Sequence, residues 1–356
     1  LETPVYITGM SYGALSASAK TALGKAASMV GSASCTGDGG MLPAEREASD
    51  KLIYQVLPSR YGFNPHHLVE AQAAEIVVGQ GAKPGTGGML MGVKVLDHIA
   101  ESRDLPSGID QRSPARHPDW LGPDDLAVKI EQIREATDGR IPVSVKLGAC
   151  RVTDDVKLAA KAGADIVVVD SMLAGTGASG EALLDHSGIP TVPSIVMARE
   201  ALRDMGLYGT VSLVASGGIR SGADMAKALA LGADACAIGI GALVALNCNR
   251  DIPEADFESE VGVSAGQCHH CQTGKCPVGI ATQDPELEKR LDPSEGADRV
   301  ANFLNSMTME AALLTRSLGK GDVRSLEPED MVALTIEASA MARIPFVGTN
   351  KVFGWD

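Results

Sequence analysis

The sequence predicts an α/β protein built as one (β/α)8 barrel, and the strongest sign of it is the βαβ unit at residues 211–243. This stretch reads as an apolar strand, a turn, a short Ala/Leu-rich helix and a second apolar strand. Glycine-rich turns follow both strands, at Ser216, Gly217 and Gly218 and at Gly239 and Gly241. Such barrels often bind phosphate after strands seven and eight, because glycine lets backbone amides approach the anion. Two tight turns without a ligand are the alternative.

The composition suits a barrel with an extension. The 356 residues are 45% hydrophobic, so we expect a barrel at 1–250 and, at 251–356, a cysteine loop and helices packed on it in the same domain. A charge of −14 argues against nucleic acid or an anionic membrane as a partner but allows a small anion. No run approaches the ~18 apolar residues of a membrane span. The scattered Cys35, Cys150, Cys236 and Cys248 suggest reduced thiols in the cytoplasm.

A long loop and helix are expected between the second and third strands. Strand one is predicted at residues 4–8 and strand two at 30–34, with an Ala-rich helix between them that ends near Met29. Residues 41–74 are polar and irregular, which predicts a long loop followed by a helix. Strand three is then predicted at residues 75–78.

Helical and apolar segments alternate in the rest of the chain. Helices are predicted at residues 124–137, 153–162 and 197–204. Strands four, five and six are predicted at residues 141–146, 165–170 and 190–195, the last with a poor strand pattern. The βαβ unit then brings the count to eight. Beyond it, helices packed against the barrel are expected at residues 299–318 and 328–342.

Charged and glycine-rich segments follow several predicted strands. Lys146 ends strand four and should point into a site, because a barrel interior cannot hold an unpaired charge. Asp38 lies between glycines after strand two, where it is either a turn residue or a ligand contact. Loops 80–90 and 171–179 are rich in glycine, which favours close approach of their backbone to a ligand.

Three cysteines lie close together after the barrel. Cys268, Cys271 and Cys276 have the spacing C-x2-C-x4-C in a loop with glycine and proline. In a reduced protein this spacing predicts a metal or cluster site. The residues alone favour an iron–sulfur cluster and zinc equally, with His269 or His270 as the fourth zinc ligand. Three unliganded thiols are the remaining alternative.

Three motifs resemble one known family. The run QGAKPGTGG at residues 80–88, the segment 170–179 and the run CPVGIATQ at residues 276–283 are similar to the FMN-binding synthase domain of glutamate synthases. The resemblance extends from Pro4 to about Gln283. The chain is also similar to the flavin subunit of N-methylglutamate synthase, and the motifs do not separate the two.

The resemblance implies an FMN barrel with an iron–sulfur cluster beside it. The FMN phosphate would lie on the two glycine-rich turns, and Lys146 would stabilise negative charge on the reduced flavin. Flavin contacts are implied for Met10, Ser11, Gln80, Lys146, Asp170, Gly175, Gly177, Ser216, Gly217, Gly218, Gly239 and Gly241. A 3Fe–4S cluster is implied on Cys268, Cys271 and Cys276, but the family's first cysteine corresponds to Ala265, so Cys268 is displaced.

The resemblance also implies a substrate site. Lys83 and Arg103 match the lysine and arginine that hold the 2-oxoglutarate carboxylates in the family. Asp38 stands where the family has a glutamate and, with Lys146, is given a catalytic role, while Met89 replaces a glutamine. The implied reaction is reductive amination of 2-oxoglutarate with ammonia. The alternative is N-methylglutamate synthesis from methylamine and glutamate.

Two further functions share part of this pattern. An inosine-monophosphate dehydrogenase-like enzyme also carries a GGI…KALALGA unit, but it needs a cysteine in the loop after strand six, and residues 193–196 have none. A scaffold without chemistry would have no need for Lys83, Arg103 and Lys146.

The implied partners include other polypeptides. The chain opens at Leu1 without the N-terminal cysteine of a glutaminase, so ammonia would come from a glutaminase-type or other subunit, a missing segment, or solution. A missing start also leaves room for a signal peptide or an N-terminal domain. The cluster would receive electrons from ferredoxin or from an NAD(P)H–flavin subunit. We therefore expect a cytoplasmic hetero-oligomer.

Overall fold

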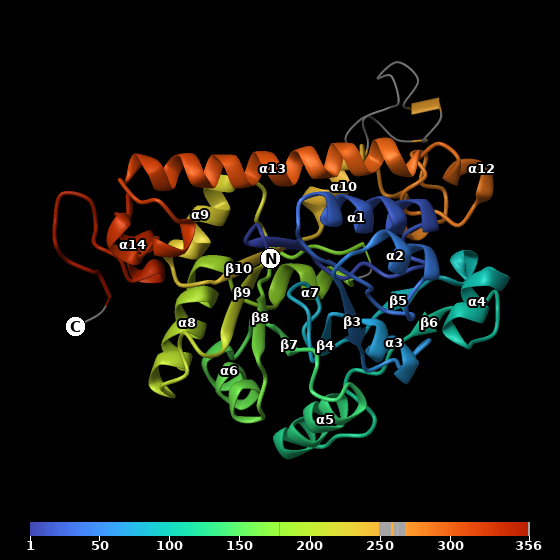
Figure 1. The fold of residues 1–356 in the computed structure, drawn as a ribbon, viewed down its shortest axis with the longest axis horizontal. Helices are drawn as coiled ribbons and strands as arrows, with labels where there is room; N and C mark the ends of the chain where they lie inside the picture. Colours follow the sequence, from blue (N-terminus) through green and yellow to red (C-terminus); the bar gives the residue numbers. More distant parts are fainter. Residues whose placement is uncertain (178, 249–257, 260–261, 263–267, 355–356) are drawn as a thin grey trace.

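The computed structural model describes residues 1–354 apart from 178, 249–257, 260–261 and 263–267 (Figure 1). Within that part of the chain, eight parallel strands form one sheet in the order β1-β10-β9-β8-β7-β4-β3-β2. The strands are β1 Val5–Ile7, β2 Ser34–Cys35, β3 Leu52–Val56, β4 Ala73–Val77, β7 Val143–Gly148, β8 Ile166–Asp170, β9 Ser212–Ser216 and β10 Ala235–Ile238.

The two ends of this sheet meet, so the sheet closes into a barrel. β1 and β2 stand at opposite ends of the hydrogen-bonded order. The backbone N–H of Ile7 donates to the carbonyl oxygen of Ala33, just before β2, over 3.0 Å. The Ser32 hydroxyl also donates to the carbonyl oxygen of Val5. The predicted (β/α)8 class is therefore confirmed.

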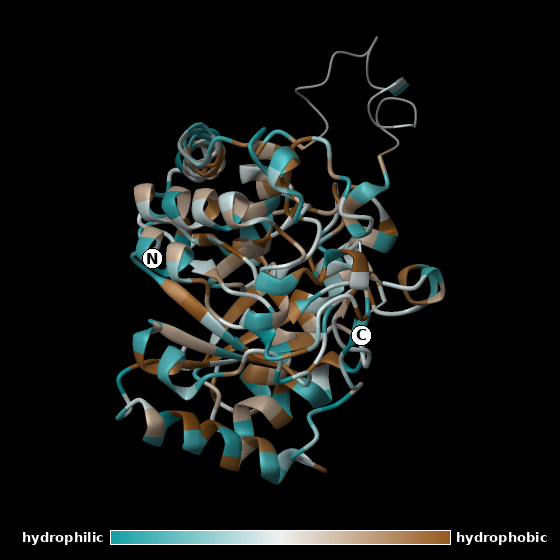
Figure 2. Ribbon diagram, turned by 90° about the vertical axis from the view of Figure 1, so that its right-hand side faces the viewer, coloured by the Kyte–Doolittle hydropathy of each residue, from teal (hydrophilic) through white to brown (hydrophobic). Residues whose placement is uncertain are grey.

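Helices surround the barrel (Figure 1). They are α1 Ala17–Met29, α2 Pro43–Ala48, α3 Pro65–Glu70, α5 Pro123–Ala136, α6 Val152–Lys161, α7 Glu181–His186, α8 Thr191–Asp204, α9 Gly222–Ala230 and α10 Ile240–Ala245. Figure 2 shows apolar strands at the centre and polar residues on the outer helices. No helix of the described residues is long and apolar enough to cross a membrane.

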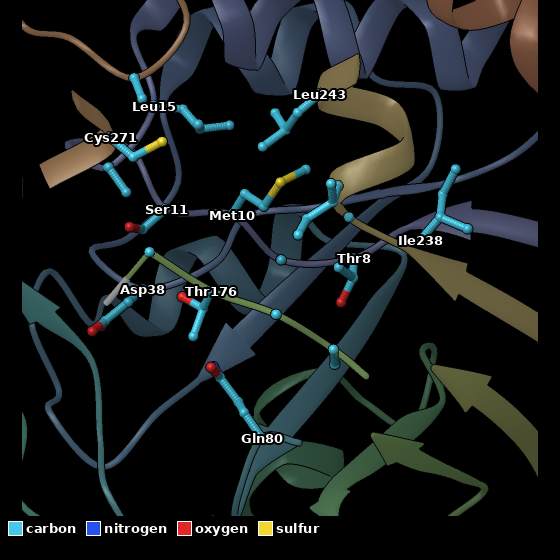
Figure 3. A pocket seen from close by; sticks show the side chains of 18 of the residues that line it. Thr8, Met10, Ser11, Leu15, Asp38, Gln80, Thr176, Ile238, Leu243 and Cys271 are labelled. Atoms are coloured by element: carbon cyan, nitrogen blue, oxygen red, sulfur yellow. The ribbon is translucent and has the colours of Figure 1, made fainter. Parts of the chain in front are cut away.

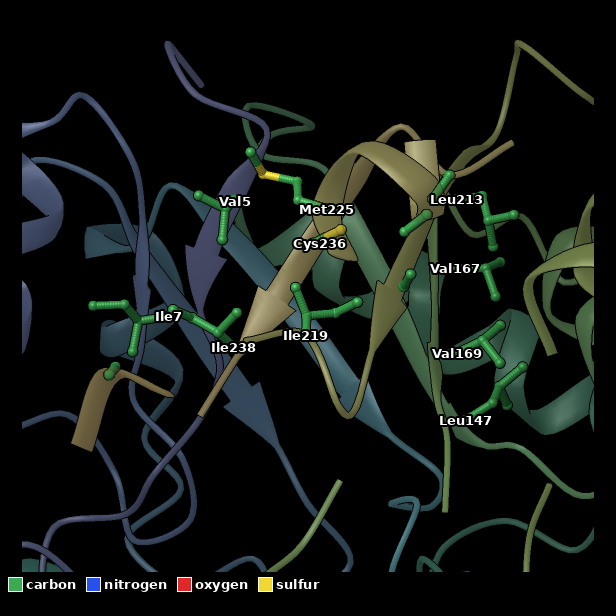
Figure 4. Packing of buried hydrophobic residues seen from close by; sticks show 14 of the residues in the cluster. Val5, Ile7, Leu147, Val167, Val169, Leu213, Ile219, Met225, Cys236 and Ile238 are labelled. Atoms are coloured by element: carbon green, nitrogen blue, oxygen red, sulfur yellow. The ribbon is translucent and has the colours of Figure 1, made fainter. Parts of the chain in front are cut away.

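Alternate side chains of each strand enter two different cores. Val5 and Ile7 belong to the large cluster between strands and helices, which also holds Val167, Leu213 and Met225 (Figure 4). In β1, β8, β9 and β10 the intervening residues Tyr6, Val168, Val214 and Ala237 point the other way and form a second, small cluster with Ala33, which lies just before β2. This alternation follows from the period of two in a strand. The apolar runs read from the sequence are therefore strands buried on both faces.

Two strand predictions were wrong, and the errors cancel in the count, while the predicted strand two at residues 30–34 shares only Ser34 with β2. β3 lies within residues 41–74, which were expected to hold a loop and a helix but no strand; α2 and α3 flank β3. The predicted strand six at residues 190–195 is the start of α8. Pro190 stands at the N-cap position of that helix, and Pro193 lies in its first turn. Backbone N–H groups in the first turn of a helix have no hydrogen-bond partner within the helix, so proline, which lacks this N–H, is tolerated there. The predicted strands three, four and five are β4, β7 and β8.

A long insertion separates β4 from β7. It contains the antiparallel pair β5 Met89–Leu90 and β6 Gln111–Arg112, the 3-10 turn η1 Gly92–Lys94 and helix α4 Asp97–Arg103. Leu90, Val95 and Ile99 form a small separate apolar cluster that holds the insertion together. This cluster places Arg103, at the end of α4, over the barrel.

The residues after the barrel are mainly helical. They form η2 His270–Gln272, α12 Pro285–Glu288, α13 Pro293–Ser317, η3 Val323–Ser325, η4 Pro328–Asp330 and α14 Ile336–Ala342. The long helix predicted at residues 299–318 is α13, which begins earlier because Asp292 caps it and Pro293 opens it. The helix predicted at residues 328–342 divides into η4 and α14. The predicted boundary at residue 250 lies outside the described residues.

Candidate functional site

One cavity of about 1050 Å³ opens at the carboxyl ends of the strands (Figure 3). It brings together every residue that the sequence placed in a flavin, substrate or catalytic role. These lining residues are Met10, Ser11, Asp38, Gln80, Lys83, Arg103, Lys146, Asp170, Gly175, Gly177, Ser216, Gly217, Gly218, Gly239 and Gly241. Their positions are therefore consistent with one site, while their individual roles remain predictions.

Lys146 and Asp170 form a buried ion pair on the cavity floor. The Lys146 Nζ lies 3.5 Å from the Asp170 Oδ2 and donates to the Thr8 hydroxyl over 3.0 Å. Burial alone would lower the pKa of Lys146, but the carboxylates of Asp170 and Glu75 outweigh it and raise that pKa. The Lys146 side chain lines the cavity, but the prediction that Lys146 ends its strand was wrong, because β7 continues to Gly148.

Glu75 and Gln55 are buried polar residues that the sequence analysis missed. They face each other across β4 and β3, and the Gln55 Nε2 donates to the Glu75 Oε1 over 2.6 Å. Burial raises the pKa of Glu75 above its ordinary value. Gln55 also lines the cavity, against the backbone of Gly9, where an added Cβ would come within 2.5 Å of the Gln55 amide. Recognising β3 from its buried apolar residues would have revealed Gln55.

We call the turns at 216–218 and 239–241 the glycine end of the cavity. Gly217 and Gly218 have φ angles of +101° and +74°, which residues that carry a side chain rarely adopt. A Cβ on Gly218 would lie 2.9 Å from the Leu173 side chain. The close approach and the left-handed backbone together require glycine here.

We call Asp38, Lys83 and Arg103 the cationic end. Lys83 is 5% exposed, and burial lowers its pKa, with the charge of Asp38 opposing that shift. Burial likewise lowers the pKa of Arg103, again opposed by Asp38. Asp38 therefore lies within electrostatic range of both cations. The Ser59 hydroxyl orients it by donating to its Oδ1 over 2.6 Å.

The Arg103 guanidinium is held by the protein itself. Its Nη1 donates to the Gln111 Oε1 over 3.0 Å, and its Nη2 donates to the carbonyl oxygen of Tyr12 over 2.8 Å. Its buried Nε has no hydrogen-bond partner within the described ranges. Gly39 makes room for this group, since a Cβ there would lie 2.8 Å from the Nε. The guanidinium is thus fixed in position before any ligand binds.

Lys20 connects two loops of the site, and the sequence analysis did not single it out. This residue of α1 is 1% exposed and pairs with Glu45 over 2.6 Å. Its Nζ also donates to the carbonyl oxygens of Met10, Cys35 and Thr36 at 2.7, 3.1 and 2.8 Å. It therefore links the loop after β1 to the loop after β2, which carries Asp38.

The three predicted metal ligands lie in one loop beside the cavity, and Cys271 lines it. The pKa of Cys271 is raised by burial and then by the thiols of Cys276 and Cys268. Burial raises the pKa of Cys248 to about 11, and the same three thiols add to that shift, so a fourth cysteine lies near them. Among the residues the structure describes, no three His, Cys, Asp or Glu side chains are grouped to hold a metal ion. Ala265 lies outside the described residues.

A buried lysine joins this loop to the barrel. Lys94 is 1% exposed, and its Nζ donates to the carbonyl oxygens of Ala14 and Cys271 at 2.6 and 2.9 Å. Farther along the loop, the Gln283 amide donates to the carbonyl oxygens of Gly13 and Leu15 at 3.1 and 2.9 Å. The cysteine loop is thereby attached to the loop that carries Met10 and Ser11.

Comparisons with known proteins agree with this arrangement. The family model described as the conserved region in glutamate synthase matches residues 1–321. A glutamate synthase large subunit-like protein of Rhizobium meliloti is 54% identical over 98% of this chain and 79% of that protein. The archaeal glutamate synthase (NADPH) of Methanocaldococcus jannaschii is 42% identical over 92% of this chain but only 61% of that protein. A mutant flavocytochrome b2 shares the fold, with a TM-score of 0.53 and 16% identity over 91% of this chain and 67% of that one.

Proposed function

This chain belongs to the glutamate synthase family, and we propose that it is an FMN-dependent oxidoreductase that acts on the C–N bond of glutamate-type amino acids. The proposed reaction is reductive amination of 2-oxoglutarate with ammonia. The observation that carries the proposal is a single cavity with a glycine end for a phosphate and a cationic end for carboxylates. The family membership also favours this activity over the inosine-monophosphate dehydrogenase-like alternative and over a scaffold.

The residues around the cavity suit FMN. Gly218 has no side chain, and a Cβ at this position would collide with Leu173. The backbone amides of the glycine end therefore stay accessible to a phosphate. Met10, Ser11, Gln80, Asp170, Gly175 and Gly177 would surround the ring system. FMN, when bound, supplies hydride transfer. Lys146 would hold a positive charge beneath the ring, and its ion pair with Asp170 keeps that charge in place.

The cationic end suits a dicarboxylate. Lys83 offers a compact charge and Arg103 a planar guanidinium, so the two would hold the two carboxylates of a five-carbon diacid. Both are buried, where a charge-assisted hydrogen bond is stronger than in water. Because Tyr12 and Gln111 already orient Arg103, little side-chain freedom is lost on binding.

The Asp38 carboxylate would bind the nitrogen of the substrate by accepting a hydrogen bond from it. Its Oδ1 is engaged by Ser59, and its Oδ2 faces the position that a Cβ on Gly88 would occupy, at 2.8 Å. The two cations would bind the carboxylates of a ligand, and the carboxylate of Asp38 between them would bind a positively charged nitrogen on the same ligand. Asp38 would thus hold an ammonium group, or a proton on the amine, next to the carbon that reacts.

The cysteine loop would hold an iron–sulfur cluster, most simply of the 3Fe–4S type. Thiolates are the ligands such clusters take, and after burial the thiols of Cys276 and Cys268 add to the raised pKa of Cys271, which they therefore neighbour. A cluster there would pass electrons from a donor, either ferredoxin or an NAD(P)H–flavin subunit, toward the cavity. Relatives such as the archaeal enzyme are longer than this chain, so partner polypeptides, including a glutaminase-type subunit, belong to the proposal.

N-methylglutamate synthesis is the second candidate. The observation that favours it is Met89, which lines the cavity next to Gly88, near the Asp38 carboxylate. An apolar thioether beside that carboxylate suits a methylated amine better than a bare ammonium ion.

Two measurements on the anaerobically purified chain test the proposal. Its visible spectrum should show flavin bands, and released flavin should be FMN near one per chain. Steady-state rates should then be compared for ammonium with 2-oxoglutarate, which needs a chemically reduced electron donor, and for methylamine with glutamate, which is redox-neutral overall and is assayed without one. Protein that binds no flavin when reconstituted with FMN contradicts the proposal. Faster turnover with methylamine selects the second candidate.

A further inference from the structure

We infer that helix α13, which lies outside the barrel, completes the phosphate end of the flavin site through Arg299. The inference rests on the proposed function, because it needs FMN in the cavity. It goes beyond that proposal by assigning a flavin contact to the segment after the barrel. From the sequence, this segment was expected only to pack against the barrel.

Helix α13 lies directly on the start of α9, the helix that follows the first glycine-rich turn. The backbone N–H of Gly222, the first residue of α9, donates to the Glu310 carboxylate of α13 over 2.7 Å. Gly222 must be glycine, since a Cβ there would collide with the carbonyl oxygen of Met307. The two helices are therefore in backbone contact beside the glycine end (Figure 1).

The same helix packs against α10, which follows the second glycine-rich turn. A Cβ on Gly241 would lie 3.4 Å from the ring of Phe303. Arg299 precedes Phe303 by one helical turn, so both residues stand on one face of α13. Both line the cavity, together with the residues of the glycine end. This face of α13 is consequently part of the wall of the cavity that also contains the glycine end, and its Phe303 contacts that end directly.

The Arg299 guanidinium is weakly engaged within the protein. Its Nη1 lies 3.7 Å from a carboxylate oxygen of Glu295, beyond hydrogen-bond distance, and the side chains of Arg299 and Glu295 are 36% and 76% exposed. Such an exposed pair contributes little. The Arg299 Nε is buried and has no hydrogen-bond partner in the part of the chain that the structure describes. A buried donor without a partner is costly, which an anionic ligand in the cavity would relieve.

The chemistry of the guanidinium selects a phosphate. Its planar fork donates two parallel hydrogen bonds to phosphate oxygens. The chain carries a net charge of −14, so a dianion needs local cations to bind. Arg299 should therefore contribute to binding of FMN but not to binding of riboflavin, which lacks the phosphate.

The test compares the two flavins on the full-length chain. Apo-protein is titrated with FMN and with riboflavin, and the dissociation constants are measured by quenching of flavin fluorescence. Arg299→Met keeps the length of the side chain and removes the charge. We expect the Kd for FMN to rise about 10- to 100-fold, while the Kd for riboflavin stays within about twofold. Arg316→Met, an exposed arginine of the same helix outside the cavity, should change neither constant.

Three outcomes decide between the ideas. Wild-type apo-protein that binds neither flavin refutes the proposed function itself. Wild-type protein that binds FMN, with an unchanged Kd in Arg299→Met, overturns the role of Arg299 alone. Equal weakening of FMN and riboflavin shows a structural role and also overturns it. If Arg299→Met does not fold, Arg299→Gln, which also removes the charge, is used, and an FMN-to-riboflavin Kd ratio equal to that of wild type counts against the inference.

Discussion

The glycine end and the cationic end of the cavity are built in opposite ways. The glycine end consists of backbone, from two consecutive strands of one βαβ unit, and local sequence specifies it. The cationic end consists of side chains from three segments far apart in the chain, namely the loop after β2, the loop after β4 and helix α4. It depends on hydrogen bonds to Tyr12, Ser59 and Gln111. A substitution at the glycine end should thus weaken cofactor binding by changing the shape of the backbone. A substitution at the cationic end should weaken substrate binding by removing charge.

The largest effect is expected for Gly218→Glu. The substitution places a side chain at φ +74° and 2.9 Å from Leu173, and it adds negative charge where a phosphate would bind. Flavin content after purification should fall close to zero. Gly180→Glu is the matched control, because φ is −70° there and no atom lies within 4 Å of its Cβ position. Normal flavin content in Gly218→Glu would contradict the assignment of the glycine end.

Replacing Cys276 should remove one cofactor and leave the other. Cys276→Ser removes a buried thiol of the cysteine loop, so iron and acid-labile sulfide should be lost together while FMN remains. Cys150→Ser, at an exposed cysteine, should change neither. If anaerobically prepared wild-type protein contains stoichiometric zinc and no iron, the cysteine loop binds a structural zinc ion and not an iron–sulfur cluster.

Charge removal at the cationic end should impair turnover without affecting the flavin. Lys83→Ala and Arg103→Ala each remove one charge-assisted contact, at a cost of roughly 2 to 4 kcal/mol of transition-state binding, or about 30- to 1000-fold in kcat/KM. The flavin spectrum should stay normal, since neither side chain is assigned to FMN. Arg112→Ala, at an exposed arginine of the neighbouring β6, serves as the control. Near-native kcat/KM in both variants would move the substrate elsewhere in the cavity.

The smallest effect concerns Glu45, which pairs with the lysine that links the loops after β1 and β2. Burial raises the pKa of Glu45 from 4.5 to about 7, although Lys20 opposes the shift. The folded state therefore binds this proton more tightly than the unfolded state. The resulting stabilisation is present in full below pH 4.5 and is lost as the pH rises through about 7.

Urea unfolding at pH 5.5 and pH 8 measures this contribution. Relative to Glu45→Gln, which cannot titrate, wild type should gain about 1–3 kcal/mol of unfolding free energy at the lower pH. Parallel pH profiles in the two proteins would show that Glu45 does not titrate in this range.

Both ends of the cavity were predicted from sequence, but on different grounds. The turns at 216–218 and 239–241 follow from local pattern, since apolar strands and glycines are adjacent in the chain. Lys83 and Arg103 entered only through resemblance to a family, because nothing local distinguishes them from surface charges, while the glycines around Asp38 left it open whether that residue is a turn residue or a ligand contact. Gln55, Glu75 and Lys20 were missed, since each looks like an ordinary polar residue of a strand or helix until its burial is known.

The sequence by itself determined the fold class, the last βαβ unit and the residue types available for phosphate, carboxylate and thiol chemistry. These depend on period-two and helical patterns and on glycine, which act over a few residues. Tertiary structure alone decided that residues 190–195 form the start of α8 rather than a strand, and that β3 takes the third place in the barrel. It also placed Arg299 of α13 on the wall of the cavity that contains the glycine end. The physical reason is that packing across long sequence separations selects among local conformations of similar energy, which no short window of sequence can rank.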